Sequence, residues 1–176
     1  MEAQVTYERY PLSIIALSNL VAVSIYALGT YLMTRLGAWW AAPYLLYCGW
    51  MEYRLLSKHC VNCCYYGKLC AFGKGRLSSV FFKQGDPQRF AQTDCGWRDM
   101  IPDMLVLGFP AVAAVVALIR GFNWITLGLL VVMVFLSFGG NAWIRGNYAC
   151  PHCKQRELGC PAEQLFNKSA KTPETP

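Results

Sequence analysis

Charged residues are scarce in this sequence. Only 15% of its 176 residues are Asp, Glu, Lys or Arg, whereas about 25% is usual in soluble domains. Apolar residues reach 55%, which is too many for an ordinary soluble domain and indicates membrane-spanning segments. The nine cysteines do not indicate a small secreted disulfide scaffold, because such scaffolds carry no long apolar runs.

Several signatures of enzymes and transporters are also missing. No pattern of a nucleophile with its base, and no carboxylate pair, supports hydrolase or transferase chemistry. Gly73-Lys74-Gly75 lacks the rest of a phosphate-binding loop. The apolar runs carry no series of polar residues such as lines a transport path. These absences favour a protein that is not an enzyme.

The long apolar runs predict the fold class. Two short breaks, Arg35-Leu36-Gly37 and Arg120-Gly121, divide the runs into two pairs. A helix needs about 20 mainly apolar residues to cross a bilayer. The sequence therefore predicts an all-α integral membrane protein with four transmembrane helices in two hairpins. The expected spans are about 12–34, 38–56, 102–119 and 122–143.

The basic residues predict the orientation. Of the 16 Lys and Arg residues, only Arg35 and Arg120 lie in the short turns, which leaves 14 at the other side. The positive-inside rule places that side, with both termini and the central segment, in the cytoplasm. The net charge of +6 then needs no nucleic acid as a partner. We expect a lipid bilayer, and an acidic cytoplasmic protein or subunits of a membrane complex, as partners.

The second half of the chain repeats the first with an offset of about 90 residues. Each half has a polar-aromatic lead-in, a proline, two apolar runs and a cysteine cluster. This order predicts two parallel repeats related by a pseudo-two-fold axis along the membrane normal. The first repeat is 1–100, with a cysteine-rich cytoplasmic loop at 57–100. The second is 101–176, with a cysteine-rich segment at 144–167 and a polar tail that we expect to be disordered.

Two cysteine triplets have the same spacing, C-x2-C-x6-C, and lie 90 residues apart (60 to 150). A C-x2-C pair places two sulfurs close enough to share one metal ion, and the reducing cytoplasm disfavours disulfides. Thiolates select zinc, copper(I) or iron–sulfur clusters. The spacing predicts a cytoplasmic metal site. Its expected ligands are Cys60, Cys63, Cys70, Cys150, Cys153 and Cys160.

This spacing resembles the binuclear zinc cluster of fungal transcription regulators, and Lys68 stands where that family often has lysine. The resemblance implies two Zn²⁺ ions held by the six cysteines, with two bridging sulfurs and pseudo-two-fold halves. It covers the cysteines alone: 79 residues (71–149), including a helical hairpin, separate Cys70 from Cys150. The family has a short linker and soluble proteins, so DNA binding is not implied.

The ligand set has several alternatives. One Zn²⁺ ion could bind the two C-x2-C pairs, or two ions could bind all six cysteines. Each half could instead form its own site, completed by Cys64 or Cys95 and by His152. An iron–sulfur cluster and unmetallated redox thiols are further alternatives.

Three functions follow from these alternatives. The leading interpretation is a structural, adapter or accessory subunit in which the metal joins the two repeats at the cytoplasmic face. The second is a membrane iron–sulfur subunit that exchanges electrons with a quinone, with Trp50, Glu52 and Tyr53 lining the pocket. The third is a thiolate sensor or carrier of metal ions.

Glu52 and the segment after Cys70 complete the set of candidates. Glu52 lies near the cytoplasmic end of the second span, where an ion pair is favoured over a proton-handling role. Its expected partners are Arg54, Arg98 or Arg145. Further on, Leu77, Val80 and Phe81 share one helical face beside basic residues. They predict a short helix that lies in the membrane interface or covers the metal site.

Overall fold

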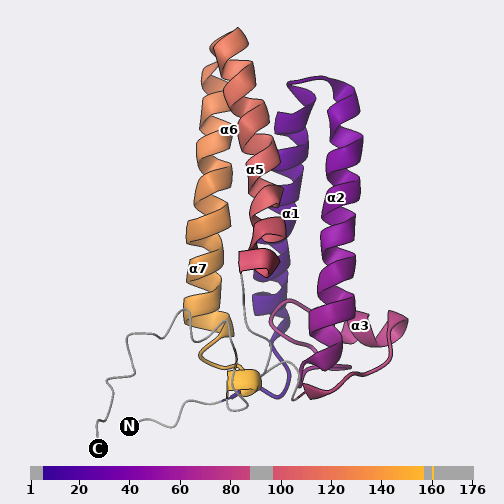
Figure 1. Ribbon diagram of the computed structural model, residues 1–176. Helices are drawn as coiled ribbons and strands as arrows, with labels where there is room; N and C mark the ends of the chain where they lie inside the picture. The colour runs from indigo at the N-terminus through magenta and orange to yellow at the C-terminus, as the bar shows by residue number, and fades with distance from the viewer. Residues whose placement is uncertain (1–5, 88–96, 157–159, 161–176) are drawn as a thin grey trace, which may run out of the picture.

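The computed structural model describes residues 6–87, 97–156 and 160, and these residues fold as a helical bundle (Figure 1). The described part contains no β-strand, only an isolated parallel bridge between Tyr7 and Cys153. The all-α prediction is thereby confirmed for these residues. The α-helices are α1 (Leu12–Thr34), α2 (Ala41–Arg54), α3 (Lys74–Phe81), α5 (Trp97–Arg120), α6 (Trp124–Phe135) and α7 (Asn141–Ile144).

Three helices are long and apolar enough to cross a membrane, which indicates a membrane protein. They are Leu12–Thr34, Met100–Arg120 and Trp124–Ala149. The third continues from α6 through α7 by way of two π-helical turns, Leu136–Gly140 and Arg145–Ala149. It therefore extends beyond the predicted end of that span at residue 143, because the helical hydrogen bonding does not stop where the apolar run stops.

The helix α2 is not among these three. It has 14 residues and is flanked by a 3₁₀ turn, Ala38–Trp40, and a π-helical turn, Leu55–His59. It runs antiparallel to α1 along the side of the bundle (Figure 1). Glu52 and Arg54 lower its apolar character. The fourth span and the pseudo-symmetric repeat remain predictions.

The helix α1 is central and contacts α2, α5 and α6. The small side chains of Ala113 and Ala114 on α5 are buried against it and let the two helices approach closely. Cys48 is buried in the same interior, as an apolar residue would be. Lipid tails are as apolar as these side chains, so the bundle depends on close packing and on polar contacts between helices.

One polar contact compensates for a proline in a span. Pro110 has no N–H, so the carbonyl of Val106 lacks its usual helical donor. The Tyr44 hydroxyl on α2 donates a hydrogen bond to that carbonyl at 3.0 Å. Tyr44 reaches it across Gly29 of α1, where an added Cβ would lie 2.2 Å from the hydroxyl oxygen. These contacts hold α2 against both α1 and α5.

Candidate metal centre

Cysteines from both halves of the chain lie in one apolar cluster below the helices. The cluster has a buried centre, to which Tyr10, Tyr65, Ala71 and Ala149 contribute. Packed against that centre are four cysteines: Cys63, Cys64, Cys70 and Cys153. The fold therefore brings thiols that are about 90 residues apart in the sequence to the same place.

Each cysteine triplet begins directly after a π-helical turn. Leu55–His59 precedes Cys60, and Arg145–Ala149 precedes Cys150. π-Helical turns are rare and are frequent at functional sites. Two of them lie at the same 90-residue offset as the cysteines, so each triplet follows its preceding helix in the same way.

The backbone hydrogen bonds of the two C-x2-C turns also correspond at this offset. In the first turn the N–H groups of Cys63 and Tyr66 donate to the carbonyls of Cys60 (3.4 Å) and Cys63 (3.0 Å). In the second turn the N–H groups of Cys153 and Arg156 donate to the carbonyls of Cys150 (3.2 Å) and Cys153 (3.1 Å). The two segments therefore present their cysteines from equivalent tight turns.

The N-terminal segment 6–11 joins the two cysteine segments, and we name it the N-terminal strap. Tyr10 donates its N–H to the Leu69 carbonyl at 3.0 Å and its hydroxyl to the Ala149 carbonyl at 2.5 Å. Tyr7 donates its N–H to the His152 carbonyl at 3.0 Å. Because the strap bonds to both segments, the polypeptide itself holds them together.

Two further side chains connect the segments directly. The Tyr65 hydroxyl donates to the Tyr7 carbonyl and accepts from the N–H of Lys154 at 3.1 Å. The Gln155 side-chain oxygen accepts from the N–H of Cys64 at 2.9 Å, and this side chain is only 1% exposed. The Gln155 amide nitrogen has no hydrogen-bond partner among the described residues. Sequence analysis missed Gln155, because a glutamine after a C-x2-C pair carries no distinctive signal.

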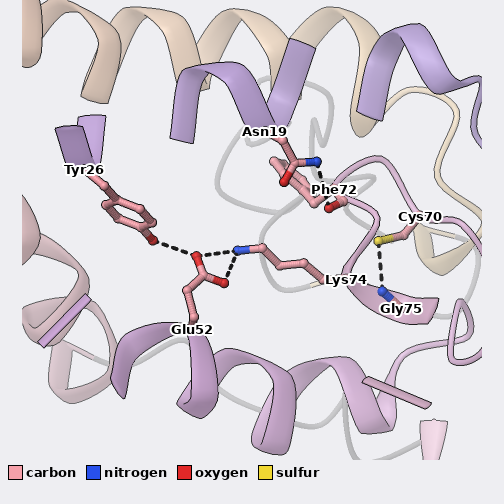
Figure 2. Close-up of polar contacts among 7 residues, drawn as sticks. All are labelled: Asn19, Tyr26, Glu52, Cys70, Phe72, Lys74 and Gly75. Carbon is pink, nitrogen blue, oxygen red and sulfur yellow. Dashed lines mark hydrogen bonds and ion pairs between the residues drawn. The ribbon is translucent and has the colours of Figure 1, made fainter. Parts of the chain in front are cut away.

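Backbone N–H groups point at three of the cysteine sulfurs. Gly75 donates to the Cys70 sulfur at 3.4 Å (Figure 2). The N–H groups of Tyr65 and Gln155 lie at the sulfurs of Cys63 and Cys153, two residues beyond the cysteine in each half. Hydrogen bonds of this kind stabilise the thiolate form, which is the form that binds metal.

Burial has the opposite effect on these thiols. Together with the charges of neighbouring sulfurs, it raises the pKa of Cys60 and that of Cys153 to about 12 each. A hydrogen bond from the Cys63 thiol lowers the pKa of Cys64, and the charges of Lys154 and Lys68 also lower it. Without a cation Cys60 and Cys153 therefore remain protonated at neutral pH, so binding of a metal ion by these two thiols would release protons.

The remaining predicted cysteine ligands lie outside that apolar cluster but near its sulfurs. Cys60, Cys150 and Cys160 are half-buried, as the cluster cysteines are; Cys60 is near enough to Cys70 and Cys63, and Cys150 and Cys160 are near enough to Cys153, for their charges to interact. The His152 ring stacks on Tyr7 at 4.6 Å between centroids. Cys95 and the predicted tail lie outside the described residues. Over 6–87, 97–156 and 160, no three His, Cys, Asp or Glu side chains are arranged to hold a metal ion. The ligand set therefore stays a prediction.

Glu52 forms an ion pair with Lys74, which was not among the partners expected from the sequence. Lys74 Nζ lies 2.6 Å from one Glu52 carboxylate oxygen and 2.8 Å from the other, where Tyr26 also donates its hydroxyl at 2.7 Å (Figure 2). The sequence offered three arginines, whereas α3 folds back against the end of α2 and brings Lys74 there. The guanidinium of Arg145 lies over the Phe72 ring, 5.3 Å from its centroid.

The loop between Cys70 and Lys74 is thus held at several points. Asn19 of α1 donates to the Phe72 carbonyl at 3.3 Å (Figure 2). Gly73 adopts the left-handed conformation with φ 71°. The loop ends at the Glu52–Lys74 pair. A cysteine of the first triplet is therefore positioned by contacts to both α1 and α2.

Comparison of the chain with models of protein families, with curated proteins and with solved structures found no match in any of the three. No function follows from similarity. The structural features that bear on function are the geometry of the two cysteine segments and their place at the end of the bundle.

Proposed function

We propose that this chain is a four-span membrane protein in which thiolate-bound zinc joins the cytoplasmic ends of two helical hairpins. The observation that carries the proposal is the shared cluster of Cys63, Cys64, Cys70 and Cys153, to which two equivalent turns contribute Cys63 and Cys153. Apolar helices gain little hydrophobic drive for association inside a bilayer. Bonds from one metal to sulfurs of both segments would supply a strong link at the helix ends.

The proposed ligands of a shared Zn²⁺ ion are the two C-x2-C pairs. Their third members, Cys70 and Cys160, would contribute if two ions bind. Cys63 and Cys153, one from each pair, already pack against the same buried centre, which supports a shared ion. The lysines that act on the sulfurs of Cys60 and Cys64 offset the negative charge of a zinc–thiolate centre. The six proposed ligands are Cys60, Cys63, Cys70, Cys150, Cys153 and Cys160.

The proposal includes α2 as the fourth span. Residues 38–59 form an almost continuous helical rod of 22 residues, about 33 Å long at 1.5 Å per residue, which matches a hydrocarbon core of about 30 Å. The ion pair with Lys74 lowers the cost of placing Glu52 close to the membrane. The corresponding π-helical turns and cysteine turns support two parallel repeats, with both termini in the cytoplasm.

Under this proposal the protein is an adapter or accessory subunit. Zinc would fix the basic cytoplasmic face, and that face would bind an acidic protein or a neighbouring membrane subunit. The iron–sulfur and metal-handling alternatives use the same cysteines. They differ from the zinc proposal in the identity and exchange rate of the metal.

Metal analysis of the purified full-length protein separates these functions. We expect colourless protein with about one or two zinc ions per chain, because Cys-rich closed sites of this kind bind zinc in tetrahedral geometry. Removal of zinc by a strong chelator should loosen the bundle, measured as a lower unfolding temperature in detergent. As a matched control, Cys48→Ala removes a cysteine buried in a span and should retain the zinc. Iron with visible absorption, or metal-free protein of unchanged stability, would contradict the proposal.

A further inference from the structure

The helix α3 is fixed to the protein by one face. The Ser78 side chain is fully buried, and its hydroxyl donates to the Leu56 carbonyl at 3.3 Å. Gly75 is also buried, and an added Cβ there would lie 2.2 Å from the Tyr65 carbonyl oxygen. Only small residues fit this face, so α3 has a single defined orientation.

The opposite face of α3 is apolar and exposed. Leu77, Val80 and Phe81 lie at helical spacing, and their exposed fractions are 47%, 71% and 69%. These side chains therefore point away from the rest of the protein and do not cover the cysteines. The sequence left two roles open for this face, and its exposure favours the membrane interface over a cover for the metal site.

The position of α3 places this face at the level of the helix ends. α3 lies beside the end of α2 that leads into the cysteine segment and projects outward from the bundle (Figure 1). Phe82, at its C-terminal end, contacts Tyr53 of α2 at 5.5 Å between ring centroids. Tyr53 and Trp50 are 59% and 50% exposed on the outer side of α2. The apolar face of α3 thus continues an aromatic band of the type found where spans leave the bilayer.

We propose that α3 lies in the cytoplasmic interface of the membrane, with its apolar face among the acyl chains and its basic residues on anionic headgroups. Arg76 is exposed on the first turn of α3 and Lys83 is exposed two residues beyond its end, and both supply charge complementary to phosphate. A lipid surface fits better than a protein groove, because the face is continuous with the exposed side of a bundle that carries three membrane-crossing helices. This inference rests on the proposed orientation of the bundle in the membrane and does not depend on zinc.

Photocrosslinking of the full-length protein in vesicles tests this placement. Phe81 is replaced by the photoreactive p-benzoylphenylalanine, and the vesicles contain phosphatidylcholine with a minority of phosphatidylglycerol. Irradiation should give phospholipid adducts, in which phosphatidylglycerol exceeds its share of the bilayer by about twofold or more. The double variant Arg76→Gln, Lys83→Gln should keep the lipid adducts and lose the enrichment.

The control carries the same photoreactive group at Gln84, an exposed residue beyond the end of α3. It should give far fewer lipid adducts than position 81. Equal lipid labelling at the two positions, or an adduct at position 81 with a second copy of the chain or another protein, would overturn the inference. Unchanged helical content and an unchanged unfolding temperature in each variant show that the fold is intact.

Discussion

Serine in place of Cys63, or in place of Cys153, is expected to remove the same bound zinc. Structural zinc sites contribute about 10–16 kcal/mol of apparent binding free energy in zinc-finger peptides, and that energy depends on the thiolate ligands. Substitution of a residue that only hydrogen-bonds to a metal ligand lowers metal affinity by roughly 10–100-fold. Loss of a ligand sulfur should lower the zinc affinity by more than this. The two residues belong to different halves of the chain, yet the structure places them in one cluster. Equal losses in the two variants are the result that a shared site requires.

Competition with a colorimetric zinc chelator measures this affinity, alongside the metal content of each variant. Cys48→Ser is the matched control, since its sulfur is buried between helices, in a different apolar cluster from the triplet cysteines. A result in which Cys63→Ser loses zinc while Cys153→Ser retains all of it would show that the first cysteine segment holds the zinc alone, and loss of half the zinc in each variant would show one site in each half. The zinc clamp between hairpins would then be wrong.

Glu52→Gln is expected to destabilise the folded protein by about 3 kcal/mol, near the lower end of what breaking a buried ion pair costs. The pair is largely shielded, with Lys74 17% and Glu52 30% exposed, so the substitution leaves an uncompensated charge inside the fold. Lys74→Met should cost a similar amount. The double variant should recover much of the loss, because neither charge remains.

Unfolding of the four proteins in detergent gives the coupling energy from a double-mutant cycle. Tyr26→Phe is a control that removes one hydrogen bond to Glu52 and leaves the charges, and it should cost only about 1–2 kcal/mol. Additive effects of the two charge substitutions would mean that Glu52 and Lys74 do not stabilise one another. α3 and the cysteine loop would then need another anchor on α2.

The apolar runs predicted the positions of two long helices well, because the composition of a run is enough to identify such a helix. The run 12–34 matches α1, Leu12–Thr34, and the run 102–119 lies inside α5, Trp97–Arg120. Hydrophobic length is a local property, so it can be read from the sequence. The two π-helical turns before the cysteines could not be predicted, because their hydrogen-bond pattern has no comparable local signature.

The candidate site was also predictable in part, because the spacing of cysteines is a local property of the sequence. The C-x2-C-x6-C spacing identified Cys63, Cys70 and Cys153, which the structure brings together. The contacts that hold them were not predictable: the Tyr10 hydroxyl bonds to a carbonyl 139 residues away. Lys74 was likewise missed as the partner of Glu52, because its position depends on how α3 folds back. Long-range polar contacts of this kind depend on the tertiary fold.

X-ray absorption at the zinc edge of the intact protein tests the zinc clamp most directly. If thiolates from both cysteine segments surround the metal, its nearest shell contains about four sulfur atoms at about 2.3 Å. A shell of nitrogen and oxygen atoms, or a preparation with no tightly bound zinc, would contradict a metal link between the two hairpins.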